Sequence, residues 1–274
     1  MGFCGVGRTV RLARAALHHW EEPCISGSRG SGAVFFSGCV MRCVFCQNYR
    51  ISAEAAGRDI STERLSEIFL ELQRQGAHNI NLVNPTHYVP EIIRALDMIG
   101  NRLNIPVVYN SGGYERAETL RALSGYVDIY LPDIKYFSDG LARELSSAEG
   151  YFEAAMAAAE EMLRQVGKPR FDGEGLLKKG VIIRHLVLPY QYRDSAEVIK
   201  RVGERFGKDV LFSLMSQYTP FYKAKDIHRL NRRITTFEYR KALDAVYAAG
   251  LEGFMQERSS AKEEYTPEFD LTGV

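Results

Sequence analysis

The sequence predicts an α/β protein built on a parallel sheet, and two observations carry this prediction. Six short apolar, β-rich runs recur along the chain, and each is nearly continuous rather than alternating, as in parallel strands covered on both faces. A segment with helical periodicity follows each run. The runs occupy 33–38, 80–85, 105–110, 126–134, 181–189 and 209–216. Strand followed by helix, six times, is typical of a (β/α) barrel or an open doubly wound sheet.

The helical segments that separate these runs carry recognisable start signals. Ser61 and Thr62 precede one helix, Pro90 opens another, and Asp194 with Ser195 is expected to cap a third. The helices are expected at 62–75, 89–103, 115–124, 151–166, 194–206 and 235–250.

The remaining segments are expected at the margins of one catalytic domain. Residues 1–32 are interpreted as an N-terminal appendage, in which the basic stretch 8–20, "RTVRLARAALHHW", has the pattern of a surface helix. Residues 166–180 are rich in Gly and charge and predict a loop insertion. The domain is expected to span 33–256, with at most one short strand after Gly250, and 257–274 to form a polar tail.

Composition and charge narrow the function classes. The 274 residues can bury one sizeable core, and 46% hydrophobic with 25% charged residues is an ordinary globular balance. The 35 Lys and Arg nearly balance the 34 Asp and Glu, so no global field favours nucleic acid or an anionic membrane. No apolar run is long enough to cross a bilayer and no signal peptide is recognisable. We therefore expect a cytoplasmic protein without nucleic-acid or membrane partners.

Three of the five cysteines, Cys39, Cys43 and Cys46, lie directly after the first predicted strand with the spacing C-x3-C-x2-C. Clustered cysteines in a reducing compartment favour metal binding over disulfides. Three thiolates can hold a [4Fe-4S] cluster and leave one iron open, whereas a structural zinc site needs four closed ligands. Cys4, Cys24 and His87 are candidate fourth ligands, so a zinc-stabilised, non-catalytic binding module stays open as an alternative.

The stretch "CVMRCVFC", with Phe45 just before its last cysteine, resembles the cluster loop of the radical S-adenosylmethionine superfamily. "SGCVMRCVFCQN" is particularly similar to the activating enzymes of pyruvate formate-lyase, and "NPTHYVPEIIRAL" to an uncharacterised branch of their homologues. The resemblance runs from about Ser31 to Phe254. It implies a partial (β/α)6 barrel, a [4Fe-4S] cluster on the three cysteines, and S-adenosylmethionine bound to the open iron through its amino and carboxylate groups.

Cofactor contacts implied by the resemblance fall at the ends of the second and third strands. Asn84, Thr86 and His87 stand where relatives carry a "GGE" motif that holds the cofactor amino group, which leaves open how this chain makes that contact. A turn capped by Thr86 is the alternative. Asn110 and Ser111, in "YNSGGY", are similar in position to residues that contact the ribose or carboxylate.

The fourth, fifth and sixth strands add further candidates. "LPDIKYF" is similar to the relatives' "LDLK" and places Asp133 and Lys135 on one face, as catalytic-site residues or as a plain ion pair. Arg184 and His185 must face opposite sides of a regular strand, and the resemblance favours Arg184 as the inward residue that meets the cofactor carboxylate. On the sixth strand, one face carries the expected adenine contacts, which are Ser213, Met215 and Gln217.

The resemblance therefore implies reductive cleavage of S-adenosylmethionine to a 5'-deoxyadenosyl radical that abstracts a hydrogen atom. By likeness to the activating enzymes, the expected substrate is a backbone glycine of a partner protein, and the electron donor is a reductase, a flavodoxin or a ferredoxin. A small molecule or another macromolecule is the alternative substrate.

Overall fold

The computed structural model describes residues 2–256 and 267–274. Its strands follow the order β10-β9-β8-β6-β5-β4-β2-β1-β3, with β7 paired to β8 beside this path. Their bounds are β1 Val10–His18, β2 Ser31–Phe36, β3 Arg58–Ile60, β4 Ile80–Val83, β5 Val107–Ser111, β6 Ile129–Pro132, β7 Arg170–Phe171, β8 Leu177–Leu186, β9 Leu211–Met215 and β10 Gly253–Met255.

The strands from β2 to β10 along this path are all parallel, and within the described residues β10 and β3 do not pair to close the sheet. Each of the six predicted runs forms one of these strands, and the short strand expected after Gly250 is β10. The predicted α/β class and partial barrel are thus confirmed. The carboxyl ends of the strands meet at one edge, where parallel α/β folds place their sites.

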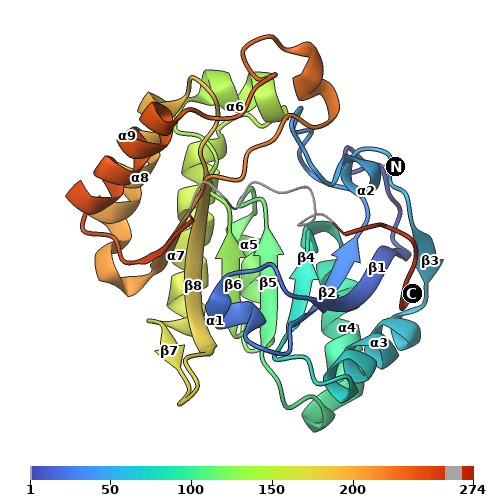
Figure 1. Cartoon of the computed structure of the whole chain (residues 1–274). Coiled ribbons are helices and arrows are strands. Elements are labelled where there is room, and N and C mark those ends of the chain that lie inside the picture. Colours follow the sequence, from blue (N-terminus) through green and yellow to red (C-terminus); the bar gives the residue numbers. More distant parts are fainter. Residues whose placement is uncertain (1, 257–266) are drawn as a thin grey trace.

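Helices form the layer outside the curved sheet (Figure 1). Their bounds are α1 Pro23–Ser26, α2 Tyr49–Ser52, α3 Thr62–Arg74, α4 Val89–Ile99, α5 Ala117–Ala122, α6 Asp139–Ser146, α7 Tyr151–Val166, α8 Tyr192–Phe206 and α9 Thr236–Ala248. Short 3-10 turns occupy Thr86–Tyr88, Gly100–Arg102, Gly207–Asp209 and Tyr222–Asp226. The described helices are all too short or too polar to span a bilayer.

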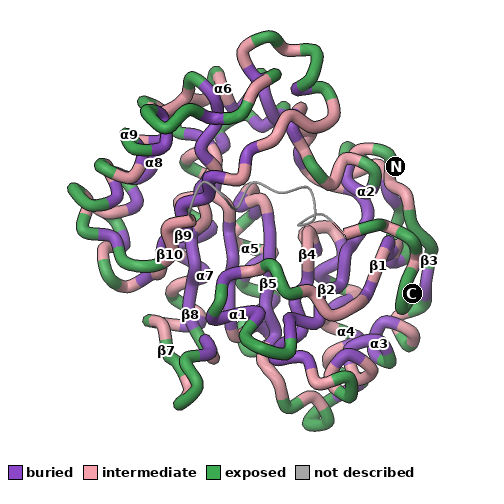
Figure 2. The backbone as a smooth tube through the Cα atoms, viewed as in Figure 1, coloured by how far each residue is buried: buried purple, intermediate pink, exposed green. Residues whose placement is uncertain are grey.

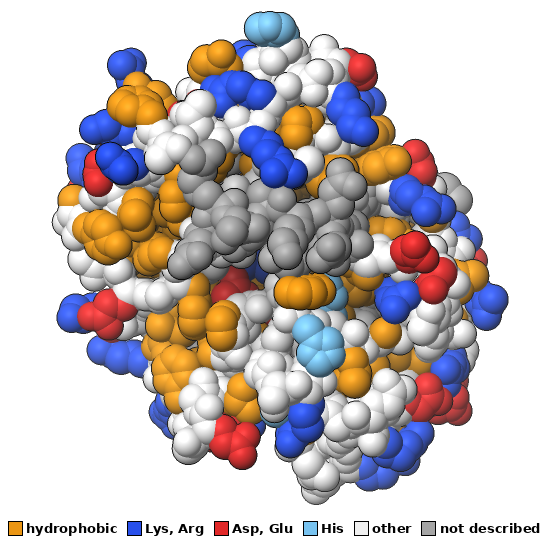
Figure 3. All heavy atoms as spheres, in the orientation of Figure 1, with side chains coloured by type: hydrophobic (Ala, Val, Ile, Leu, Met, Phe, Trp, Pro, Cys, Tyr) orange, Lys and Arg blue, Asp and Glu red, His pale blue; other side chains and the backbone are white. Residues whose placement is uncertain are grey.

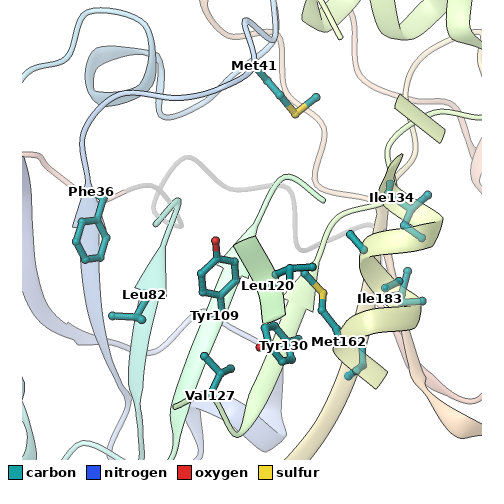
Figure 4. Packing of buried hydrophobic residues seen from close by; sticks show 14 of the residues in the cluster. Phe36, Met41, Leu82, Tyr109, Leu120, Val127, Tyr130, Ile134, Met162 and Ile183 are labelled. Atoms are coloured by element: carbon teal, nitrogen blue, oxygen red, sulfur yellow. The ribbon is translucent and has the colours of Figure 1, made fainter. Parts of the chain in front are cut away.

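The parallel strands β2, β4, β5, β6 and β9 are almost entirely buried, as their near-continuous apolar sequences require (Figure 2). Tyr109, Tyr130 and Ile183 point into the large core under the helices (Figure 4). Their strand neighbours face inward: Val108 and Ile182 belong to a separate apolar cluster inside the barrel. This two-residue alternation decides which side chains can reach the barrel interior.

The helix starts agree with the sequence in two of three places. Ser61 accepts a hydrogen bond from the backbone N–H of Arg64, and Pro90 lies in the first turn of α4. The expected cap at Asp194 is wrong, because α8 already begins at Tyr192. The Asp194 carboxylate instead accepts hydrogen bonds from the backbone N–H groups of residues 137 and 138, beside the start of α6.

The surface helix expected over 8–20 is also wrong. These residues form β1, which pairs antiparallel with both β2 and β3. Ala, Leu and Arg favour helix locally, but pairing with the otherwise open edge of β2 buries Val10, Leu12 and Ala13 and outweighs that preference.

The segment after β1 enters the barrel interior. Helix α1 places Cys24 and Ile25 against the inward side chains of β5, β6 and β8, so it fills the amino-terminal end of the barrel. The chain crosses this end of the sheet between β1 and β2 (Figure 1). Glu21, just before α1, is thereby brought beside the inner face of the sheet.

Two marginal segments are more ordered than expected. The loop insertion 166–180 contains β7, which forms an antiparallel pair with the start of β8. The last residues lie along β1: the backbone N–H of Ala15 donates to Thr272 O over 2.9 Å, and that of Leu271 donates to Ala13 O over 3.1 Å. The first part of the expected tail, 257–266, lies outside the described residues.

Candidate active site

A cavity of about 240 Å³ opens at the carboxyl ends of the parallel strands. Its wall combines the cysteine loop after β2 with the ends of β4, β5, β6, β8 and β9, and with residues from the N- and C-terminal segments. Cys39, Cys43 and Cys46 all line it. The cavity therefore unites the thiols with the strand ends on which the sequence placed its other candidates.

Each of the three thiols is held by a neighbouring group. Ser146, at the end of α6, donates a hydrogen bond to Cys43 Sγ over 2.9 Å. Cys46 Sγ lies 3.2 Å from Ser52 Oγ, and the backbone N–H of Met41 donates to Cys39 Sγ over 3.4 Å. Hydrogen bonds of this kind orient thiolate ligands and tune the bound centre.

The donor set fits a [4Fe-4S] cluster. Burial raises the pKa of Cys39 to about 12 and that of Cys46 to about 11, so these thiols release their protons when they bind metal. Cys4 and Cys24 do not line the cavity. Among the described residues, no three His, Cys, Asp or Glu side chains are close enough to bind one metal ion, as a zinc site would require, whereas cluster ligands each bind a different iron.

Opposite the cysteine loop, the cavity wall carries an ion network. Arg184 Nε donates to Asp133 Oδ1 over 2.9 Å, and Lys135 Nζ forms an ion pair with Asp133 Oδ2. All three side chains are largely buried, with 14–16% of each exposed. Burial alone would raise the pKa of Asp133, but the two cations outweigh it and lower that pKa. The Asp133–Lys135 pair is thus not a solvent-exposed one.

Glu21 completes this network and was missed by sequence reasoning. Its Oε2 lies 3.2 Å from Arg184 Nη1, and its Oε1 accepts from Asn81 Nδ2 over 2.9 Å. Arg184 Nη2 donates to Asn110 Oδ1 over 2.6 Å, so every nitrogen of the guanidinium already has a protein partner. The only local signal for Glu21 is the acidic pair in "HHWEEP", since its partner lies 163 residues away.

The adjacent Glu22 is also buried, and no hydrogen bond reaches its Oε2 from the described residues. Burial raises its pKa, and the positive charge of Arg184 only partly opposes this effect. Glu21, Glu22 and Asp133 therefore face two cations, Lys135 and Arg184. The network holds one more carboxyl group than cations.

Arg184 and His185 face opposite sides of β8, as the strand geometry predicts. Arg184 lines the cavity, whereas His185 is 1% exposed and its Nδ1 lies 2.7 Å from Ile134 O. His185 is thus a buried histidine beneath the helix layer.

The other candidate cofactor residues divide into two groups. Those that line the cavity are Phe45, Asn84, Asn110, Ser111, Met215 and Gln217. Those that do not line it are Thr86, His87 and Ser213.

Thr86 and His87 lie behind the cavity wall and form hydrogen bonds with other residues there. The Thr86 hydroxyl donates to Glu115 Oε1 over 2.7 Å, and His87 Nε2 lies 2.7 Å from Ser37 O. Asn84 has a left-handed backbone with φ of 59°, and its side-chain amide donates to Gly38 O. The end of β4 thereby holds the backbone that leads into Cys39.

The chain matches the family model of the radical SAM superfamily over residues 33–202. It is also similar to the uncharacterized protein MJ0674 of Methanocaldococcus jannaschii, with 31% identity over 252 residues that cover 89% of this chain and 68% of that protein.

Three solved structures share the fold at low sequence identity. SuiB of Streptococcus suis, bound to its precursor peptide SuiA, has a TM-score of 0.50 at 17% identity over 80% of this chain and 46% of that chain. The hydrogenase maturase HydG has a TM-score of 0.54 at 15% identity, and the match covers 79% of this chain and 48% of HydG. Spore photoproduct lyase has a TM-score of 0.53 at 14% identity, and the match covers 80% of this chain and 75% of the lyase. This chain thus spans about half the length of SuiB and HydG. Because the family model matches more than half of its residues, the chain belongs to the radical SAM superfamily.

Proposed function

We propose that this protein binds a [4Fe-4S] cluster through Cys39, Cys43 and Cys46 and uses it with S-adenosylmethionine to abstract a hydrogen atom from a backbone glycine of a partner protein. The single observation that carries the chemistry is that Cys39, Cys43 and Cys46, and no further cysteine of the described residues, line one cavity at the strand ends. When bound, such a cluster supplies the electron that cleaves the sulfonium of S-adenosylmethionine. A reductase, flavodoxin or ferredoxin is the proposed source of that electron.

The polar wall of the cavity is proposed to hold S-adenosylmethionine. Phe45, Met215 and Gln217 surround the adenine, and Asn84, Asn110 and Ser111 offer polar groups to the amino acid and ribose. Arg184 contributes positive charge toward the cofactor carboxylate, within a site that Glu21 and Asp133 keep aligned. Thr86 and His87 act through the residues that they support. Asp133 and Lys135 are proposed to serve the catalytic site on the side that the substrate enters.

The proposed protein substrate rests on the similarity of "SGCVMRCVFCQN" to the activating enzymes of pyruvate formate-lyase and of "NPTHYVPEIIRAL" to a branch of their homologues. SuiB, which shares the fold, was crystallised with a precursor peptide. A barrel of this type is thus compatible with a polypeptide substrate.

Two measurements on the anaerobically iron-loaded protein test the proposal. After dithionite reduction, chromatography should detect 5'-deoxyadenosine and methionine formed from S-adenosylmethionine. Mixtures with candidate partners should then give a persistent doublet in electron paramagnetic resonance from a backbone glycine. If deuterium reaches 5'-deoxyadenosine from a small metabolite and never from a protein, the substrate assignment is wrong although the cleavage chemistry stands.

A further inference from the structure

A positively charged surface lies at the cavity mouth and takes no part in the site described above. The loop 217–235, between β9 and α9, carries five Lys and Arg residues but one acidic residue, Asp226. Arg229 pairs with Glu144 and Arg232 with Glu238. Lys223 and Lys225 are exposed and have no acidic partner among the described residues. Figure 3 shows basic side chains gathered over this loop, along the upper edge of the face.

This loop is joined to the cysteine loop. The Tyr222 ring stacks on Tyr49 with centroids 5.0 Å apart and planes 9° from parallel. The backbone N–H of Ala224 donates to Val44 O over 2.8 Å. Arg50, next to Tyr49, is exposed and likewise lacks an acidic partner in the described part of the chain. We name Arg50, Lys223 and Lys225 the basic rim.

The basic rim is continuous with the cavity. Gln217, Thr219 and Phe221, from the same loop, line the cavity wall. The loop is also held at its far end, where the Tyr218 hydroxyl donates to Leu230 O over 2.9 Å. A surface that is already ordered loses little conformational freedom when it binds a ligand. Its cations are therefore positioned to guide a chain segment toward the cysteine loop.

We propose that the basic rim binds an acidic segment of the polypeptide substrate, which rests on the proposed function and adds the chemical class of its partner. Three unpaired cations match a short run of Asp or Glu, whereas specific nucleic-acid binders commonly neutralise six to ten phosphates. One face of each tyrosine ring is covered by the other, and Lys223 Nζ lies 5.3 Å from the Tyr222 centroid. The Tyr49–Tyr222 pair therefore offers less ring surface for the base stacking on which single-stranded nucleic acids depend.

The test uses the full, iron-loaded chain and a fluorescein-labelled peptide with three Glu on each side of a glycine. A peptide with Gln in place of Glu is the neutral control. Fluorescence anisotropy should show that the acidic peptide binds and that added salt weakens it, as expected for exposed charges. The double variant Lys223→Glu and Lys225→Glu should weaken binding by about tenfold.

The matched control is Arg74→Glu with Arg170→Glu, which makes the same charge change at two exposed arginines. Arg74 ends α3 and Arg170 lies in β7, so both are at the opposite, amino-terminal end of the barrel. This control should change the affinity less than about twofold, since its charges lie at the other end of the barrel and salt weakens the interaction of exposed charges with distance.

Two results would overturn the proposal. The first is equal binding of the acidic peptide to the rim variant and to the control variant. The second is tighter binding of a single-stranded oligonucleotide of equal charge, lost in the rim variant. In the absence of peptide, the rim variant should cleave S-adenosylmethionine as fast as the wild type. If the wild-type protein forms no 5'-deoxyadenosine, the proposed function is rejected. The peptide-binding result is judged separately, from the anisotropy measurements.

Discussion

Both ends of the barrel interior bury polar side chains, but it is at the carboxyl end that these side chains line a cavity together with the three clustered cysteines. At the amino-terminal end, the Ser31 hydroxyl donates to Asn79 Oδ1 over 2.5 Å, and Asn79 Nδ2 donates to Ile25 O over 2.8 Å. Helix α1 lies at this end and packs Cys24 and Ile25 against the inward side chains of β5, β6 and β8. At the carboxyl end, thiols and an ion network line a cavity.

The difference between a structural polar cluster and a candidate site lies in what surrounds the polar side chains. Ser31 and Asn79 are satisfied by direct neighbours and leave no unpaired group for a ligand. At the other end, Asp133, Lys135 and Arg184 are paired with one another, yet all three line the cavity, so their charges border the space in which a ligand would lie. Buried charge is costly unless it is compensated, so a protein retains it where a ligand or a reaction uses it.

The largest effect should come from the cysteines. Replacing any one of Cys39, Cys43 or Cys46 by Ala should reduce the iron content from roughly four atoms per chain to near zero, because each thiolate holds a separate iron. Cys24→Ala, at the opposite end of the barrel, and Cys4→Ala are the matched controls and should keep the full content. Iron analysis after anaerobic reconstitution measures this, and equal loss in Cys4→Ala would reject the three-ligand assignment.

Arg184→Leu should give the next largest effect. If Arg184 meets the cofactor carboxylate as proposed, the substitution removes a charge-assisted contact worth on the order of 1.5 to 3 kcal/mol, so the affinity for S-adenosylmethionine should fall roughly tenfold to a hundredfold. It also leaves Glu21 and Asp133 without their shared cation, so stability should fall as well.

Isothermal titration measures the affinity of Arg184→Leu, and thermal melting monitors its fold. His185→Leu is the neighbouring control: it faces the helix layer and should lower stability while the affinity stays unchanged. A folded Arg184→Leu protein that binds S-adenosylmethionine as tightly as wild type would remove Arg184 from the cofactor site.

Asn79→Ala tests the amino-terminal end of the barrel. The substitution leaves the Ser31 hydroxyl and Ile25 O without their partner, so the free energy of unfolding should fall by about 2 kcal/mol. Urea unfolding measures this change. Because α1 separates this end from the cavity, the affinity for S-adenosylmethionine should not change. A loss of affinity as large as that of Arg184→Leu would show that the two ends are not independent.

The smallest effect concerns Glu238, in a closed polar cluster outside the barrel. Burial alone would raise its pKa, but hydrogen bonds from Arg232, Thr235 and Tyr190 outweigh this and lower the pKa to about 2. A lowered folded-state pKa stabilises the protein above the unfolded-state pKa, and this stabilisation is lost as the pH falls toward 2. Between pH 5 and pH 3 the loss should be roughly 1.5 kcal/mol.

Urea unfolding of wild type and Glu238→Gln at both pH values measures this loss. The variant cannot titrate at this position, so its stability should fall less over the same interval. Equal falls in the two proteins would show that Glu238 does not titrate with a lowered pKa.

The parallel sheet could be predicted because each strand is a nearly continuous apolar run that tertiary packing reinforces. Strand β1 could not be predicted, because its Arg, Leu and Ala residues favour helix locally. They form a strand because they pair with the edge of β2, which is a contact between segments that the local sequence does not reveal. The cap at Asp194 failed for a similar reason, because its carboxylate serves the start of a different helix.

The candidate site divides in the same way. The cysteine spacing is a short-range pattern, and strand alternation predicts that Arg184 and His185 face opposite sides, while the family resemblance favours Arg184 as the inward residue. The structure brings Arg184 and the three cysteines to one cavity. Glu21 could not be found, because its role depends on how β1 and α1 pack against a strand far away in the sequence. Thr86 and His87 are adjacent to Asn84 in the chain, yet the turn after β4 directs them behind the wall.

The most direct test of the account is whether S-adenosylmethionine binds the iron that the three cysteines leave open. Electron nuclear double resonance should be recorded on the reduced, iron-loaded protein with S-adenosylmethionine carrying ¹⁷O in its carboxylate and ¹⁵N in its amino group. The account predicts hyperfine coupling of both labels to the cluster. Absence of both couplings in a protein with about four irons per chain would contradict it, because the fourth iron would then not hold the cofactor.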